Sequence, residues 1–139
     1  MKKSFLLIIL LITGISASSQ SVTDKEKKTP EIKFDKKVYN FGKIYEDEQA
    51  VHEFVFYNVG TAPLIIKNAS SSCDCTVPEW SKAPIMPGDS GTIKASFNPK
   101  GYAGHTFRKT LTIFTNVREG DQKNMVYGLQ ITGRVIRRD

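Results

Sequence analysis

Short runs in which apolar and polar residues alternate recur between residues 32 and 136, and they are rich in β-branched and aromatic side chains. Alternation with a period of two is typical of β-strands with one buried face, and the Gly, Pro and Asn clusters between the runs mark turns. A helical period is almost absent from this region. The pattern therefore predicts about seven strands, at residues 32–34, 38–41, 52–58, 64–66, 91–97, 107–113 and 125–135.

Each predicted strand carries its large apolar residues on one face. Two sheets packed face to face bury both faces, so the pattern predicts an all-β fold, an immunoglobulin-like antiparallel β-sandwich of about seven strands. A small closed barrel shows similar patterning and is the alternative. Gly133 interrupts the apolar face of the last strand, at a position where a neighbouring segment can approach closely. The expected core is formed by Phe54, Phe56, Ile93, Phe97, Leu111, Ile113, Leu129 and Ile131.

The first residues have the features of a secretory signal peptide. Lys2 and Lys3 precede an apolar run at 5–12, and small residues follow it, with cleavage expected between Ser19 and Gln20. The run is far shorter than the roughly 20 residues of a membrane span, and no cysteine lies near the cut to take a bacterial lipid anchor. We therefore expect a signal peptide at 1–19, a flexible polar leader at 20–31 and one domain at 32–136. An uncleaved short anchor is the alternative.

These features predict an exported protein, periplasmic or secreted, in a Gram-negative bacterial envelope. Removal of Lys2 and Lys3 lowers the formal net charge from +6 to +4. This modest excess does not indicate nucleic-acid binding. The densest basic cluster, formed by Arg134, Arg137 and Arg138, lies at the C-terminal end, where solvated basic residues are ordinary.

Cys73 and Cys75 form the sharpest chemical feature of the sequence. In an extended strand their α-carbons lie about 6.5 Å apart, near the upper limit for a disulfide, so a bridge needs a local bend. Asp74 lies between them. Three interpretations are open: a local disulfide, two small thiols packed as apolar groups, or a functional pair that is redox-active or binds a soft metal such as Cu(I). Zinc is disfavoured because it usually has four ligands at other spacings.

Other residues near the cysteines widen these interpretations. If the strands on either side of Gly60 run antiparallel, His52 and Cys73 lie at the same end of the domain, which would allow a Cys–His metal site or a thiol with a base. The alternative is a histidine at the rim of the fold. Trp80 either pins its loop to the edge of the sandwich or is an exposed anchor for a partner. The acidic run at 46–48 fits a solvated turn better than a weak calcium site.

The order of several short motifs resembles the bacterial domain-of-unknown-function family fifteen seventy-three. The resemblance covers about residues 32–136 and implies an exported immunoglobulin-like domain related in pattern to ciliary ASH domains and the major sperm protein fold. It brings no known activity. Family members often have Gly between the two cysteines, where this chain has Asp74. The motifs are Phe41-Gly42, Phe54-x-Phe56-x-Asn58-x-Gly60-x-x-Pro63-Leu64-x-Ile66, Ser72-Cys73-x-Cys75-Thr76, Pro87-Gly88-x-Ser90-Gly91 and Leu129-x-Ile131-x-Gly133.

The sequence contains no recognisable catalytic set, such as a nucleophile elbow, a zinc-protease motif or a phosphate-binding glycine loop. We therefore expect a non-catalytic envelope module without a cofactor that binds unidentified envelope proteins or has a structural role. The alternative is a periplasmic thiol-redox or Cu(I)-binding protein that uses Cys73 and Cys75.

Overall fold

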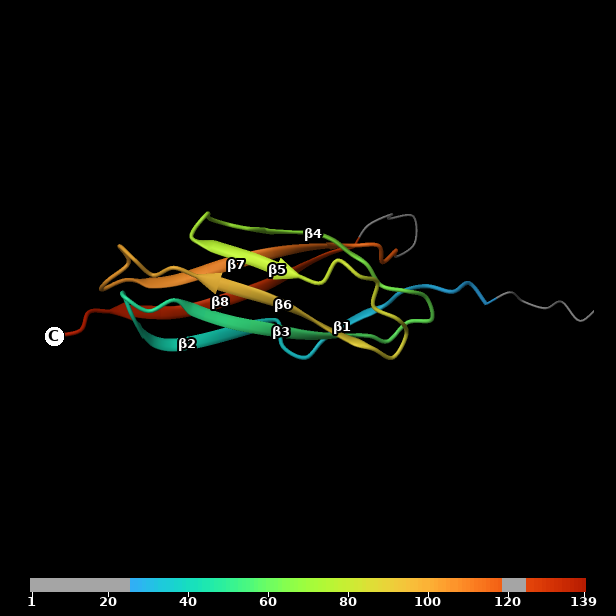
Figure 1. The fold of residues 1–139 in the computed structure, drawn as a ribbon, viewed down its shortest axis with the longest axis horizontal. Coiled ribbons are helices and arrows are strands. Elements are labelled where there is room, and N and C mark those ends of the chain that lie inside the picture. The colour runs from blue at the N-terminus through green and yellow to red at the C-terminus, as the bar shows by residue number, and fades with distance from the viewer. Residues whose placement is uncertain (1–25, 119–124) are drawn as a thin grey trace, which may run out of the picture.

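The computed structural model describes residues 26–118 and 125–139, which form two four-stranded sheets packed face to face (Figure 1). The described residues contain strands and turns but no helix. The expected signal peptide at 1–19 and the leader up to residue 25 lie outside the described residues. The strands are β1 (Ile32–Phe34), β2 (Val38–Tyr45), β3 (Ala50–Asn58), β4 (Ile66–Ser71), β5 (Thr76–Trp80), β6 (Ser90–Phe97), β7 (Thr106–Thr115) and β8 (Val126–Ile136).

The strand order is β1-β3-β6-β5 in one sheet and β2-β8-β7-β4 in the other. This architecture confirms the predicted immunoglobulin-like β-sandwich, and its two separate sheets exclude the closed barrel. One pair departs from the antiparallel expectation, because β2 runs parallel to β8. The cause is the short connection at 35–37, where the chain leaves β1 in the first sheet and enters β2 at the edge of the second.

Two edge strands differ from the pattern expected from the sequence. The additional strand, β5, contains Pro78, which cannot donate a hydrogen bond to a ladder and so belongs at an edge. The strand expected at 64–66 is instead an isolated bridge between Leu64 and Ile85, and β4 runs on from Ile66 through polar residues. Alternation is weak in both strands because each lies at a sheet edge, with one paired neighbour.

The core lies between the two sheets, as the sequence pattern predicted. All eight side chains expected there are at most 1% exposed. Gly133 confirms the predicted close approach, because a Cβ atom at this position would lie 2.8 Å from two ring carbons of Phe107. Alternation along the strands therefore located the buried faces correctly.

The segment just before β1 is bonded to the domain. The backbone oxygen of Thr29 accepts hydrogen bonds from Thr61 N at 2.8 Å and Ala62 N at 3.2 Å, and Val59 N donates to Glu31 O at 2.9 Å. A Cβ atom at Gly60 would lie 2.4 Å from Thr29 O, so glycine permits this contact. The fixed contacts thus begin at Thr29, within the range expected to be a flexible leader.

Candidate functional site

The two cysteines lie in the turn that crosses from one sheet to the other. β4 ends the second sheet and β5 ends the first, and the two strands lie side by side along one edge of the sandwich (Figure 1). In this turn Cys73 and Cys75 form a disulfide, and their α-carbons are 5.3 Å apart. The bend is supported by a hydrogen bond from Thr76 N to Cys73 O at 3.3 Å. No non-glycine residue in the described ranges has a positive φ, so Asp74 makes this bend without the left-handed conformation.

The turn is fastened to both sheets by hydrogen bonds. Ser72 and Thr110 exchange two of them, from Ser72 N to the backbone oxygen at 2.9 Å and from Thr110 N to the serine hydroxyl at 3.1 Å. Asn98 N donates to Cys75 O at 2.9 Å. The turn is therefore held against β7 on one side and the end of β6 on the other.

The two sulfur atoms have different surroundings, although both cysteines are half-buried. Cys75 packs against the hydrophobic core. The hydroxyl of Tyr102 donates to Cys75 Sγ at 3.6 Å, and Lys109 Nζ donates to that hydroxyl oxygen at 3.2 Å. Lys109 Nζ also lies 4.7 Å from the centre of the Tyr102 ring. A polar chain therefore leads from a cation to one sulfur of the disulfide.

Tyr102 and Lys109 were not among the residues for which the sequence predicted a chemical role. A signal for Lys109 was present, because alternation in β7 places it on the same face as Phe107 and Leu111, both of which are buried. A half-buried lysine at an inward position needs a polar partner. Nothing in the local sequence indicates that the partner is Tyr102, which lies in the loop between β6 and β7.

His52 lies away from the cysteines, on the side of the sandwich where β2 meets β3. Its ring stacks on Tyr39 with centroids 3.6 Å apart, and it meets the edge of Phe54 at 4.6 Å. Burial lowers the pKa of His52, and the charge of Lys36 lowers it further, while Glu53 opposes them. The expected antiparallel pairing does not occur, because β3 and β4 belong to different sheets. The described residues hold no group of three potential metal ligands, and the structure does not bring His52 to the pair.

Trp80 lies where β5 faces β4. Its Nε1 donates to the backbone oxygen of Ile66 at 3.2 Å, and Lys82 Nζ lies 3.1 Å from the centre of its ring. The indole is half-buried against the core. The hydrogen bond joins the two edge strands, which is the arrangement expected of a tryptophan that pins its loop.

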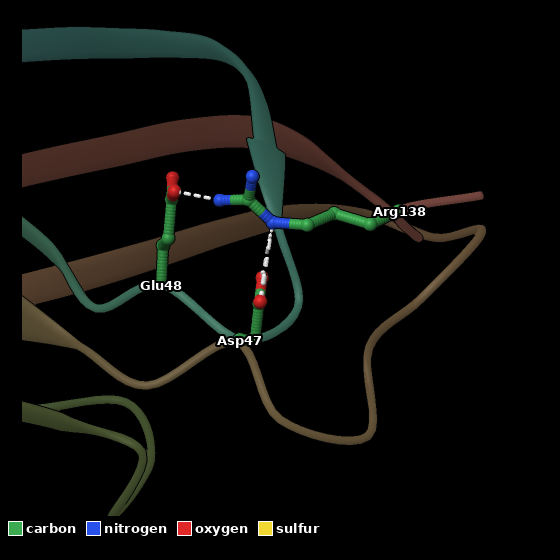
Figure 2. Close-up of polar contacts among 3 residues, drawn as sticks. All are labelled: Asp47, Glu48 and Arg138. Atoms are coloured by element: carbon green, nitrogen blue, oxygen red, sulfur yellow. Dashed lines mark hydrogen bonds and ion pairs between the residues drawn. The ribbon is translucent and has the colours of Figure 1, made fainter.

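The acidic run lies opposite the C-terminal arginines. Figure 2 shows the guanidinium of Arg138 between the carboxylates of Asp47 and Glu48, with Nε 3.1 Å from Asp47 Oδ2. Arg137 Nε lies 3.5 Å from Glu46 Oε2. The hydrogen bond that Arg138 donates to the Asp47 carboxylate raises the pKa of the guanidinium. These acidic residues are thus neutralised by arginines of the same chain.

A protein-family model described as "Protein of unknown function (DUF1573)" matches residues 32–135. The chain belongs to this family. No curated protein matches it. The matched region contains β1 to β7, the disulfide turn and β8 apart from its last residue, Ile136.

Solved structures with a similar fold come from several sources. The DUF1573 chain matches a Porphyromonas gingivalis W83 protein of unknown function at 15% identity and a TM-score of 0.63, over 77% of this chain and 47% of that protein. It matches the ASH/PapD-like domain 7 of human CEP192 at 11% identity and a TM-score of 0.65, over 91% of this chain and 99% of that domain. A chaperone–tip adhesion subunit pre-assembly complex of Acinetobacter baumannii Csu pili matches at 12% identity and a TM-score of 0.53. The match covers 77% of this chain and 57% of the chain in that complex.

One further neighbour is an enzyme. The Vibrio cholerae VesB protease matches at 11% identity and a TM-score of 0.58, over 76% of this chain but only 32% of the protease. The chain thus spans about half of the Porphyromonas protein and a third of VesB. At these identities the likeness shows the fold, which is an immunoglobulin-like or PapD-like β-sandwich. No helix within 26–118 and 125–139 is long and apolar enough to cross a membrane.

Proposed function

We propose that this chain is an exported envelope module that acts by binding another protein and has no catalytic activity of its own. The observation that carries the proposal is a pair of exposed valines on the outer face of the β1-β3-β6-β5 sheet, one on each side of a small serine. Val51 and Val77 are 45% and 53% exposed and flank Ser96, which is 8% exposed. Exposed apolar side chains that gather on one face of a domain are typical of protein contact surfaces.

The strand register places these three residues in one line. Val51 of β3 and Val77 of β5 both pair with Ser96 of β6. Ser96 is small and almost buried between its two larger neighbours, so the exposed groups of this row are the methyl groups of the two valines. We call Val51, Ser96 and Val77 the valine row.

The residues beside the valine row define the chemistry of the partner. The next row contains Glu53, Lys94 and Glu79, and Lys94 Nζ already pairs with Glu79 Oε2 at 3.3 Å. Glu53 has no salt bridge among the described residues. A partner with an apolar patch and a basic side chain beside it would match both rows. The pilus complex among the structural neighbours supports a binding role for folds of this kind.

The binding role can be tested by photo-crosslinking in living cells. A photoreactive residue at Val51 or Val77 should capture a defined envelope protein, while the same residue at Val126, which is 49% exposed on β8, should not. The captured protein is then purified. Its affinity should fall at least about tenfold for Val51→Lys and remain unchanged for Val126→Lys. Equal capture from all three positions, or equal affinities, would refute the valine row as the binding surface.

Export is part of this proposal and has its own test. Cleavage between Ser19 and Gln20 gives a mature chain that starts at Gln20. Intact mass spectrometry of the envelope fraction should give the mass of residues 20–139. Recovery of the full-length chain in a membrane pellet would indicate an uncleaved anchor instead.

A second function, thiol–disulfide exchange, is favoured by the position of Cys73 and Cys75 in a half-exposed turn. Exchange requires that the pair alternates between oxidised and reduced states in the cell. Rapid alkylation of thiols in intact cells, followed by mass spectrometry, should find both states. A pair found fully oxidised under all growth conditions would leave only a structural bridge. Cu(I) binding would require the same two sulfurs as thiolates, so it competes with the disulfide.

A further inference from the structure

The disulfide turn is chemically asymmetric, because the two sulfur atoms have different contacts. Cys75 packs on the core and accepts the hydrogen bond from Tyr102, whose oxygen is in turn bonded by Lys109. Among the described contacts of Cys73, its sulfur meets only the hydroxyl of Thr76, at 3.8 Å, and Cys75 Sγ meets the same hydroxyl at 4.0 Å. The Tyr102–Lys109 pair is therefore what distinguishes the two sulfurs.

We infer that Cys73 is the sulfur attacked by an incoming thiol, and that Tyr102 and Lys109 stabilise the Cys75 thiolate that leaves. The inference concerns the reaction of the bridge and rests on the second proposed function only for its use in the cell. The rate of exchange rises as the leaving sulfur becomes a better thiolate. A hydroxyl donor backed by a cation favours charge on the sulfur that it contacts.

The reaction balances with an external thiol as the reductant. Its thiolate forms a bond with Cys73 Sγ, the bond between Cys73 and Cys75 breaks, and the electron pair of that bond leaves on Cys75 Sγ. A second thiolate then attacks the external sulfur and releases Cys73 as a thiolate. Two external thiols have become one disulfide, and the protein disulfide has become two thiols.

The supporting groups are held in place before any reaction. Tyr102 packs edge-on against Phe97 at 5.5 Å, and its backbone is fixed by hydrogen bonds to Pro99 O and from His105 N, both 2.9 Å long. Lys109 extends from an inward position of β7, where the neighbouring core restricts its side chain. A hydrogen bond that requires no reorganisation is worth more when charge develops. Tyr102 contacts the reacting sulfur directly, whereas Lys109 is a positioning residue that acts through Tyr102.

Trapping with glutathione tests which sulfur is attacked. The oxidised protein is exposed briefly to reduced glutathione, quenched with acid, alkylated and mapped by mass spectrometry. We expect glutathione on Cys73 and the alkyl group on Cys75, with an excess of about tenfold or more over the opposite arrangement. Glutathione mainly on Cys75, or equally on both residues, would overturn the assignment.

Substitution of the supporting residues tests the stabilisation of Cys75. Tyr102→Phe removes one hydroxyl and should slow reduction of the bridge by a small dithiol about tenfold, the usual effect of a hydrogen bond to a charged group. Lys109→Met should slow it less, and Lys109→Arg should restore most of the rate. Tyr57→Phe, which removes an exposed hydroxyl from the other side of the sheet, is the matched control and should leave the rate unchanged. A Tyr102→Phe rate equal to that of the unmodified protein would overturn the role of Tyr102.

The pH dependence of the reduced protein separates this role from a merely structural one. The pH midpoint for alkylation of Cys75 should be lower than that of Cys73, and Tyr102→Phe should raise the Cys75 midpoint alone. Equal denaturant midpoints for the oxidised proteins would show that the fold is unchanged. Equal alkylation midpoints for the two thiols would refute the proposal. If the bridge reacts as proposed in solution but is always oxidised in the cell, the exchange function fails while the reaction order stands.

Discussion

At the scale of single residues, Asn58 holds one end of the sandwich together. It is fully buried, and its Nδ2 donates to the backbone oxygens of Ala62 at 2.8 Å and Ile85 at 2.9 Å. Its Oδ1 accepts from Gly60 N at 3.0 Å. One side chain thus ties the end of β3 to the following turn and to the loop before β6. The sequence showed Asn58 as a motif residue, and the structure gives the physical reason.

Replacement of Asn58 tests this role. Asn58→Ala leaves the part-buried carbonyl of Ala62 and amide of Gly60 without their side-chain partner, while the Ile85 carbonyl keeps its bond from Leu64 N. We therefore expect the free energy of unfolding to fall by about 1–3 kcal/mol. Urea denaturation measures this change. Asn68→Ala, at an exposed position of β4, is the control and should change stability by less than about 0.5 kcal/mol. Equal midpoints for the two variants would show that the Asn58 hydrogen bonds are not important.

The second prediction at this scale concerns pH and His52. Its pKa is lowered in the folded protein by burial, so the unfolded chain binds the proton more readily. Its contribution to stability is therefore complete above the unfolded pKa of about 6.5 and is lost as the pH falls through that value. Urea midpoints measured between about pH 7.5 and 5.5 should fall less for His52→Gln than for the unmodified protein. The same pH dependence in His52→Gln and in the unmodified protein would contradict the prediction.

At the scale of elements, β8 is packed so closely that one position excludes a side chain. A Cβ atom at Gly133 would lie 2.8 Å from the Phe107 ring and 3.1 Å from Gly42 O, whereas one at Gly128 of the same strand would meet nothing within 4 Å. The alternation of the strand separates the two glycines, because only Gly133 falls on its apolar face. Their difference arises because Gly133 faces the core and Gly128 faces outward along the alternation of the strand.

Alanine at these two positions gives a matched pair of variants. Gly133→Ala forces the Phe107 ring or the backbone to move, and overpacking of this kind costs about 1–3 kcal/mol. Gly128→Ala adds a methyl group in open space and should leave stability unchanged or slightly higher, because alanine restricts the unfolded chain. Chemical denaturation compares the two. Equal losses would mean that the approach of β7 to β8 is looser than the structure shows.

At the scale of the whole molecule, the sandwich is closed along one edge by the turn that carries the disulfide. The bridge spans a sequence separation of only two residues, so it restricts the unfolded chain little. Hydrogen bonds from Ser72, Asn98 and Trp80 tie the same edge to both sheets. The closure therefore depends mainly on packing and hydrogen bonds rather than on the covalent link.

The double variant Cys73→Ser/Cys75→Ser tests this closure. We expect it to stay folded and to lose at most about 2 kcal/mol, since a loop this short contributes little chain entropy. Phe56→Ala, which removes a fully buried ring, should cost about 3–5 kcal/mol and is the positive comparison. Both losses are read from urea denaturation of the mature protein. A double variant that unfolds more easily than Phe56→Ala would show that the disulfide is a principal support of the fold.

Much of the fold was predictable because a strand with one buried face shows alternating apolar and polar residues in the sequence. Alternation alone located all eight expected core residues and the close approach at Gly133. It failed at β5 and β4, where edge positions and Pro78 remove the pattern. It also gave no warning that β2 would run parallel to β8, because strand direction is decided by where the chain crosses between sheets.

The sequence by itself determined the class of fold, the buried faces and the presence of a closely spaced cysteine pair. Only the tertiary structure decided what surrounds that pair. It set His52 on the other side of the sandwich and brought Tyr102 and Lys109 to Cys75 instead. The physical reason is the separation in sequence of the residues involved. Alternation is a local property of one strand, whereas the groups around Cys75 Sγ come from β5, β7 and the loop after β6. These segments meet only when the two sheets close on each other.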